Sequence, residues 1–145
     1  MSSIGHLARR FIASLSRREP DVADTAWVDS HLHDGELALW RRMSVADRRH
    51  SIAVARRFET SGEWSPDEVA GALLHDVGKL DSGLGTISRV VATIIGPRTE
   101  RFRRYHDHEQ IGAEMLDAAG SSDITVELVR GQGRAAAALL AADDI

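Results

Sequence analysis

A histidine, an aspartate and a lysine lie within one otherwise apolar stretch of the chain, at residues 73–80. The stretch reads Leu73-Leu74-His75-Asp76-Val77-Gly78-Lys79-Leu80. Polar and charged side chains are costly to bury unless they have partners. The fold must therefore supply partners for these three side chains.

The residues before this stretch predict the start of a helix. Ser65 suits the N-cap, Pro66 suits the first turn, and Glu68 completes a capping box three residues after the cap. The helix is expected to run from about Pro66 to Val77. Gly78 would then be its C-terminal stop.

His75 and Asp76 lie roughly 100° apart around such a helix. Both side chains can reach one ion only if it lies beyond the helix end or at its edge, which is a geometry that suits a metal site. The chain has no cysteine, so disulfides and thiolate ligands are excluded. Histidine, aspartate and glutamate remain as ligands, and this donor set fits a hard or borderline divalent ion.

The sequence His75-Asp76-Val77-Gly78-Lys79 resembles the signature of the HD-domain metal-dependent phosphohydrolase superfamily. This resemblance implies an all-helical fold in which an earlier histidine, the His-Asp pair and a later aspartate are metal ligands. The earlier histidine corresponds to His50. The later aspartate corresponds to Asp143, with the adjacent Asp144 as an alternative. The resemblance covers roughly residues 45–145.

His50 lies on an apolar face of the helix expected at about 45–60. His50, Val54 and Phe58 repeat every four residues along that face. A single histidine in such a position is more often a core residue than a ligand. The His-Asp pair follows 25 residues later, after a short turn at 61–63. Two antiparallel helices would then face each other, which favours the ligand role for His50.

The segment around His108 resembles part of the second metal site in two-metal HD proteins. In those proteins a histidine before Ile-Gly-Ala, here His108, is joined by another histidine after a Leu-Val-Arg helix. This chain instead reads Leu128-Val129-Arg130-Gly131-Gln132-Gly133. The resemblance therefore implies one divalent ion (Mn, Fe, Ni, Mg or Zn), with His108 acting on substrate or water.

The remaining sequence predicts further helices joined by short loops. They are expected at about 3–18, from 21 to a break at Asp34-Gly35, and at 37–43, 87–95, 99–119 and 134–145. The unbroken apolar run in the last of these indicates burial. His31 and His33 are interpreted as a surface loop, because a two-residue spacing does not place both on one helix face. We expect one all-α domain, an HD-domain-like helical bundle of about eight helices. Residues 1–44 would be an N-terminal extension packed on a core at 45–145.

Net charge and the distribution of apolar residues limit which partners and which cellular location we expect. A formal net charge of −4 argues against a nucleic-acid polymer as the partner. No apolar run approaches the ~20 residues of a membrane span, and the first residues lack the pattern of a signal peptide. We therefore expect a cytoplasmic protein with a small phosphorylated substrate and no membrane partner, and a homo-oligomer stays open.

The resemblance implies a metal-dependent phosphohydrolase that acts on a phosphate ester or anhydride of a small nucleotide-like substrate. Lys79 and Arg104, which belongs to an arginine-rich segment at 98–104, would hold the phosphate. Lys79 and His108 would be the catalytic residues, with His108 positioning water or protonating the leaving oxygen. The alternative is a weak or inactive HD-like module for ligand binding or protein interaction.

Overall fold

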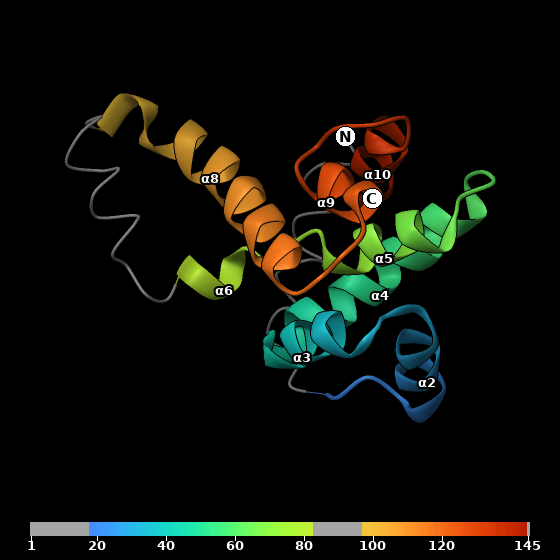
Figure 1. Ribbon diagram of the computed structural model, residues 1–145. Coiled ribbons are helices and arrows are strands. Elements are labelled where there is room, and N and C mark those ends of the chain that lie inside the picture. Colours follow the sequence, from blue (N-terminus) through green and yellow to red (C-terminus); the bar gives the residue numbers. More distant parts are fainter. Residues whose placement is uncertain (1–17, 83–96, 145) are drawn as a thin grey trace, which may run out of the picture.

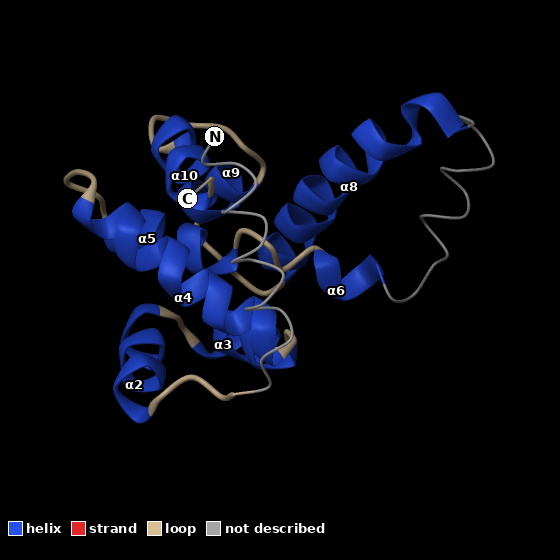
Figure 2. Cartoon of the chain, turned by 180° about the vertical axis from the view of Figure 1, so that it is seen from behind, coloured by secondary structure: helices blue, strands red, loops and turns tan. Residues whose placement is uncertain are grey.

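The computed structural model describes residues 18–82 and 97–144, with side chains at 18–80 and 108–144 (Figure 1). Within these ranges all regular secondary structure is helical, which confirms the expected all-α fold (Figure 2). The helices are α2 Val22–His31, α3 Asp34–Arg42, α4 Val45–Thr60, α5 Pro66–Leu74, α6 Lys79–Ser82, α8 Pro97–Ala118, α9 Asp123–Val129 and α10 Ala136–Asp143. None of them is both long and apolar enough to cross a membrane. The helices expected at 3–18 and 87–95 fall outside the described residues.

Helix α5 is the most deeply buried element of the described chain. Every residue from Glu68 to Leu74 is buried, and α5 contacts α4, α9 and α2. Helix α10 packs on α4, and α8 contacts α9 and α6. Trp40 on α3 is also buried and donates a hydrogen bond of 2.9 Å from its ring nitrogen to Ser51 on α4. The core therefore lies around the two helices that lead to the His-Asp pair.

Helix α5 begins as predicted and ends earlier than predicted. Ser65 and Glu68 form the expected capping box. The helix ends at Leu74, however, and residues 75–78 form a turn. Within this turn the amide of Val77 donates to the carbonyl of Leu74, and the bond spans three residues instead of four. The expected extension to Val77 was therefore wrong, because the chain tightens at the His-Asp pair.

Gly78 is needed for a close contact between two segments and not for a left-handed stop. No positive φ angle is found at this glycine. A Cβ atom on Gly78 would collide with the backbone carbonyl oxygen of His108 on α8. The absence of a side chain at Gly112 is needed for the same contact, since a Cβ there would lie 3.0 Å from the Gly78 amide nitrogen. Two glycines thus let α8 cross directly over the turn after α5.

The segment between α2 and α3 is shorter than predicted. The sequence predicted a break at Asp34-Gly35, but Asp34 is the first residue of α3. The His33 ring nitrogen Nδ1 accepts hydrogen bonds from the amides of Gly35 and Glu36 and so caps the helix. His31 ends α2, and its Nδ1 lies 2.8 Å from the Trp27 carbonyl oxygen. Histidine replaced the usual serine or aspartate as the N-cap here, and the start of α3 was missed for that reason.

The alanine-rich run forms α10, but only one face of this helix is buried. Leu139 and Ala142 belong to the core. Ala137 and Ala141 are exposed, and Leu140 keeps 62% of its surface accessible. Burial of the whole run was therefore a wrong expectation. An apolar run of small residues carries no periodic signal that separates the two faces.

Candidate metal centre

Two imidazoles and one carboxylate from distant parts of the chain come together at one point. His50 lies on α4, His75 follows α5, and Asp143 ends α10. Their donor atoms all lie within 4.8 Å of one another. The Nε2 atom of His50 is 2.8 Å from Oδ1 of Asp143, and Nε2 of His75 is 3.4 Å from the same oxygen. All three residues are partly buried.

The position of His50 follows from the packing of α4. Val54 and Phe58, which lie one and two turns further along the same face, are fully buried. Burial of these two side chains turns that face of α4 toward the interior. His50 therefore points inward at the end of the apolar stripe, as the four-residue spacing predicted.

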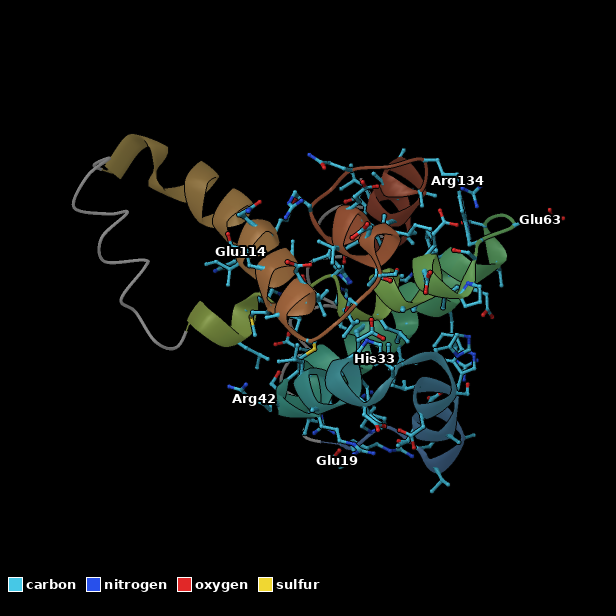
Figure 3. The ribbon with its side chains drawn as sticks, viewed as in Figure 1. Glu19, His33, Arg42, Glu63, Glu114 and Arg134 are labelled. Atoms are coloured by element: carbon cyan, nitrogen blue, oxygen red, sulfur yellow. The ribbon has the colours of Figure 1, made fainter. Side chains whose placement is uncertain are left out.

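Helix α10 is attached to α4 and α5 at both of its ends. Near the C-terminal end, Nε of Arg57 donates a hydrogen bond of 3.0 Å to the carbonyl oxygen of Ala142, the residue before Asp143. At the other end, Arg134 donates to the Glu63 carbonyl at 3.1 Å and to the Glu68 carboxylate at 2.7 Å (Figure 3). These contacts hold Asp143 against His50.

The imidazole of His75 is oriented as a metal ligand needs. Its Nδ1 atom lies 2.7 Å from the Ala72 carbonyl oxygen, and a carbonyl oxygen only accepts hydrogen bonds, so Nδ1 carries a proton. The other nitrogen, Nε2, is buried and has no hydrogen-bond partner. Metal-bound histidines commonly donate their second nitrogen to a carbonyl in this way. The donor set at this site therefore fits a divalent ion.

The electrostatics of the cluster keep its carboxylate ionised. Burial alone would raise the pKa of Asp143, but the imidazoles of His50 and His75 beside it outweigh burial and hold that pKa well below its ordinary value. Burial would lower the pKa of His75, whereas Asp143 and Asp76 together raise it. Asp143 is thus an anion at neutral pH, and a cation placed between the three side chains would meet an existing negative charge.

Asp76 lies beside the group of three and not within it. Its Oδ2 atom is 3.4 Å from Nε2 of His75 and 3.2 Å from Nζ of Lys79. The Lys79 ammonium is also 3.9 Å from Oδ1 of Asp47, three residues before His50 on α4. Asp47 was missed in the sequence analysis, although its spacing from His50 places both on one side of the helix.

Asp144, the alternative to Asp143, is the exposed C-cap of α10. Asp143 is the member of the pair whose carboxylate contacts His50 and His75. The ligand roles of His50, His75, Asp76 and Asp143 stay predictions.

A cavity of about 360 Å³ opens next to the cluster. Its described lining comprises His75, Asp76, Lys79, His108, Glu109, Leu128, Val129, Gly131, Ala136, Ala137, Leu139, Leu140 and Asp143. Both predicted catalytic residues, Lys79 and His108, therefore face the same space as His75. Glu109 was not singled out from the sequence, where no spacing pattern set it apart. The backbone of Arg104 belongs to α8, but its side chain falls outside the described residues.

The model of one protein family matches the chain. It is the HD domain, and the match covers residues 47–138. The chain belongs to the HD domain family. The matched part of this HD domain includes His50, His75 and Asp76, and it ends before Asp143. No curated protein and no solved structure matches the chain.

Membership in the family agrees with the helical fold and with the possible metal site. HD domains bind divalent metal ions and are generally hydrolases. The family match does not reach the third member of the cluster, whereas the structure brings Asp143 next to the two matched histidines. The HD domain of this chain therefore combines the matched histidines with a carboxylate from outside the match.

Proposed function

We propose that this HD domain is a metal-dependent phosphohydrolase acting on a phosphate ester or anhydride of a small nucleotide-like substrate. One observation supports this more than any other. The buried Nε2 atom of His75 has no hydrogen-bond partner, lies 3.4 Å from Asp143, and belongs to a residue that lines a cavity. A buried imidazole nitrogen held beside two carboxylates in this way suits a metal ion next to a substrate pocket.

The chain offers four ligands for one divalent ion, which would be Mn, Fe, Ni, Mg or Zn. His50, His75 and Asp143 would hold it, and Asp76 would join them by a small movement from its present place beside His75. Such an ion would lower the pKa of a bound water molecule and neutralise charge that develops on phosphorus. Four protein ligands leave coordination positions for water and a phosphate oxygen.

Lys79 and His108 both line the cavity and would act on the substrate there, Lys79 from α6 and His108 from α8. The Lys79 ammonium is half-exposed and lies near Asp76, so it can contact a phosphate oxygen next to the ligands. Arg104, one turn before His108, would add a second contact to the phosphate. Hydrolysis forms a bond from the water oxygen to phosphorus and breaks the bond to the leaving oxygen, which His108 would protonate.

A second candidate function is a ligand-binding or interaction module with weak or no catalysis. The observation that favours it is the absence of a histidine at residues 131–133, where two-metal HD proteins carry one. The structure places Gly131 in the cavity lining, with no side chain to offer a ligand. The metal ion and the cavity residues would then bind a phosphorylated molecule without cleaving it. We also propose a cytoplasmic location and a small-molecule partner.

Substitution of Lys79 tests the proposed catalysis. Lys79→Ala should retain the metal and lower kcat/KM, because it removes a phosphate contact that strengthens in the transition state. Arg41→Ala is the matched control, since Arg41 is an exposed cation on α3 paired with Asp29. Wild-type protein that hydrolyses no mononucleotide, cyclic dinucleotide or guanosine polyphosphate with Mn, Ni, Mg, Fe or Zn would favour the binding module.

A further inference from the structure

A second cavity, of about 430 Å³, lies between α4 and the segment that leads into α2. One side of it is formed by residues 18–21 together with Asp24, and the other by Arg49, Ile52, Ala53 and Arg56 of α4. The four α4 residues are spaced by three, one and three positions, so they lie on one face of the helix. No described residue lines both this cavity and the one at the predicted metal centre. The two cavities are therefore separate sites.

The carboxylates in the lining of this second cavity already have partners within the protein. Glu19, which is labelled in Figure 3, forms an ion pair of 3.0 Å with Arg48. Asp24 forms an ion pair of 2.7 Å with Arg56. Asp21 accepts a hydrogen bond from the amide of Asp24 and so caps α2. Each of these carboxylates therefore serves a cation or an amide of the chain itself.

Arg49 is a cation of the same lining that still needs an acceptor. Its Nη1 atom is buried and has no hydrogen-bond partner in the described part of the chain. A buried charged donor without an acceptor is costly. Residues 1–17, which precede the cavity in the chain, contain no aspartate or glutamate, so they cannot supply a carboxylate. An anion from outside the chain would provide the missing acceptor.

The chemistry of the lining indicates which anion would fit. A guanidinium group is planar, and its donors match the paired oxygens of a carboxylate or a phosphate. The rest of the lining includes the apolar side chains of Pro20, Ala53 and the buried Ile52. A cavity of this volume, with apolar walls and few charged groups, is typical of sites for small organic ligands.

We propose that this cavity binds a small organic oxyanion, a carboxylate or a phosphate with a short apolar group. A small turn of the Arg49 side chain would let its guanidinium pair with the oxyanion, and the apolar group would lie against Ile52 and Pro20. The site goes beyond the proposed hydrolysis, because it uses none of the residues that line the cavity at the predicted metal centre.

Titrations followed by NMR test this site without relying on turnover. The isotope-labelled full chain, without added metal, is titrated with sodium butyrate and separately with n-butyl phosphate, and sodium chloride at equal ionic strength is the reference. We expect saturable shifts of the backbone amides at 18–24 and 49–56 with at least one of the two anions. The anion that binds more tightly identifies the oxyanion group of the ligand. Butyrate should leave the amides at 136–143 unchanged.

Substitutions of Arg49 locate the binding. Arg49→Met keeps the aliphatic part of the side chain and removes the guanidinium, so the affinity should fall at least about tenfold. Arg49→Lys keeps the charge and loses the planar pair of donors, and its affinity should lie between those of the wild type and Arg49→Met. Arg42→Met is the matched control, because Arg42 is exposed on α3 and does not line the cavity. The control should bind as the wild type does.

Three results would overturn the inference. The first is that neither anion shifts the amides at 18–24 and 49–56 more than sodium chloride does. The second is equal affinity in Arg49→Met and Arg42→Met, with both variants folded by their amide spectra. The third is that Arg49→Lys binds no more tightly than Arg49→Met. The phosphohydrolase proposal stands or falls separately, since it depends on Lys79 and the predicted metal ligands.

Discussion

The Nε2 atom of His50 lies 2.8 Å from Oδ1 of Asp143, although 93 residues separate the two in the chain. Two residues of helix α4 contribute to this contact. One is His50 itself, and the other is Arg57, two turns later, which donates a hydrogen bond to the carbonyl of Ala142. Helix α4 therefore carries the predicted ligand His50 and also holds the backbone next to the predicted ligand Asp143. The geometry of the metal centre therefore depends on the packing of α10 against α4.

The first prediction concerns Arg57 as a positioning residue. Arg57→Met should keep the aliphatic part of the side chain and remove the hydrogen bond to Ala142. We expect the affinity for Mn²⁺ to fall about tenfold, as is typical when a group that orients a ligand is removed. Calorimetric titration of the purified variant with Mn²⁺ measures the change.

The neighbouring arginine provides the control for that measurement. Arg56 forms an ion pair with Asp24 at 2.7 Å and stacks over the Trp27 ring, away from α10. Arg56→Met should lower thermal stability slightly and leave the Mn²⁺ affinity unchanged. Equal Mn²⁺ affinities in both variants would show that Arg57 does not position Asp143.

The contact between Gly78 and α8 leads to a second prediction. Gly78→Ala forces a Cβ atom against the His108 carbonyl oxygen, so the turn and α8 must move apart. We expect the free energy of unfolding to fall by about 2–3 kcal/mol, the upper range for overpacking a core. Urea unfolding measures this loss.

Gly120→Ala separates the steric effect from a general intolerance of glycine substitution. Gly120 has a φ angle of 89°, and no atom lies within 4 Å of where its Cβ would be. Its substitution should cost about 1 kcal/mol through the left-handed backbone alone. If Gly78→Ala costs no more than Gly120→Ala, the close approach of α8 is not as described.

Elements defined by local signals could be predicted from the sequence. Helix α4 was expected at about 45–60 and is found at Val45–Thr60. Ser44 caps its first turn and an apolar stripe with four-residue spacing runs along it, so capping and periodicity agree. The positions of His50 and of the His-Asp pair relative to the core followed from these signals and from the family signature.

Features set by tertiary contacts could not be predicted in the same way. The end of α5 at Leu74 depends on α8 crossing at Gly78, which no local pattern reveals. The two faces of α10 could not be told apart, because alanine and leucine occur on both. Arg57 gave no signal either, since its partner is a backbone carbonyl far along the chain. Each of these features could be predicted only if the distance between segments that are remote in sequence were known.

The third prediction tests Asp76 as a fourth ligand. Asp76→Ala should cancel most of the rise in Tm that Mn²⁺ gives the wild type, because the variant binds the ion more weakly and gains less by mass action. Asp144→Ala removes the exposed carboxylate beside Asp143 and serves as the control. A variant at Asp76 that gains as much Tm from Mn²⁺ as the Asp144 variant would exclude Asp76 from the ligand set.

The fourth prediction concerns the pH dependence of stability through Glu68, which helps to anchor α10. Burial would raise the pKa of Glu68, but hydrogen bonds from Ser65 and Arg134 hold it below its ordinary value of 4.5. A depressed pKa means that the stabilisation is fully present above about pH 4.5 and is lost as the pH falls through the folded value.

Glu68→Gln should therefore be less stable than the wild type by about 1.5–3 kcal/mol at pH 7, the range for hydrogen bonds to a charged group. The difference should narrow as the pH falls below about 4.5. Urea unfolding between pH 7 and pH 3.5 measures it. Glu63→Gln is the control, because the side chain of Glu63 is exposed in the turn before α5. A difference between wild type and Glu68→Gln that is constant with pH would contradict the assignment.

The most direct test of the metal centre is X-ray diffraction from crystals grown with Mn²⁺, with data collected at the manganese absorption edge. The structure predicts one strong anomalous peak per chain, within bonding distance of Nε2 of His50, Nε2 of His75 and a carboxylate oxygen of Asp143. The ion at this peak should lie between His50 and Asp143, so that the present hydrogen bond between these two side chains is lost. The absence of any peak between these three side chains, or a single peak bound elsewhere in the chain, would contradict the account.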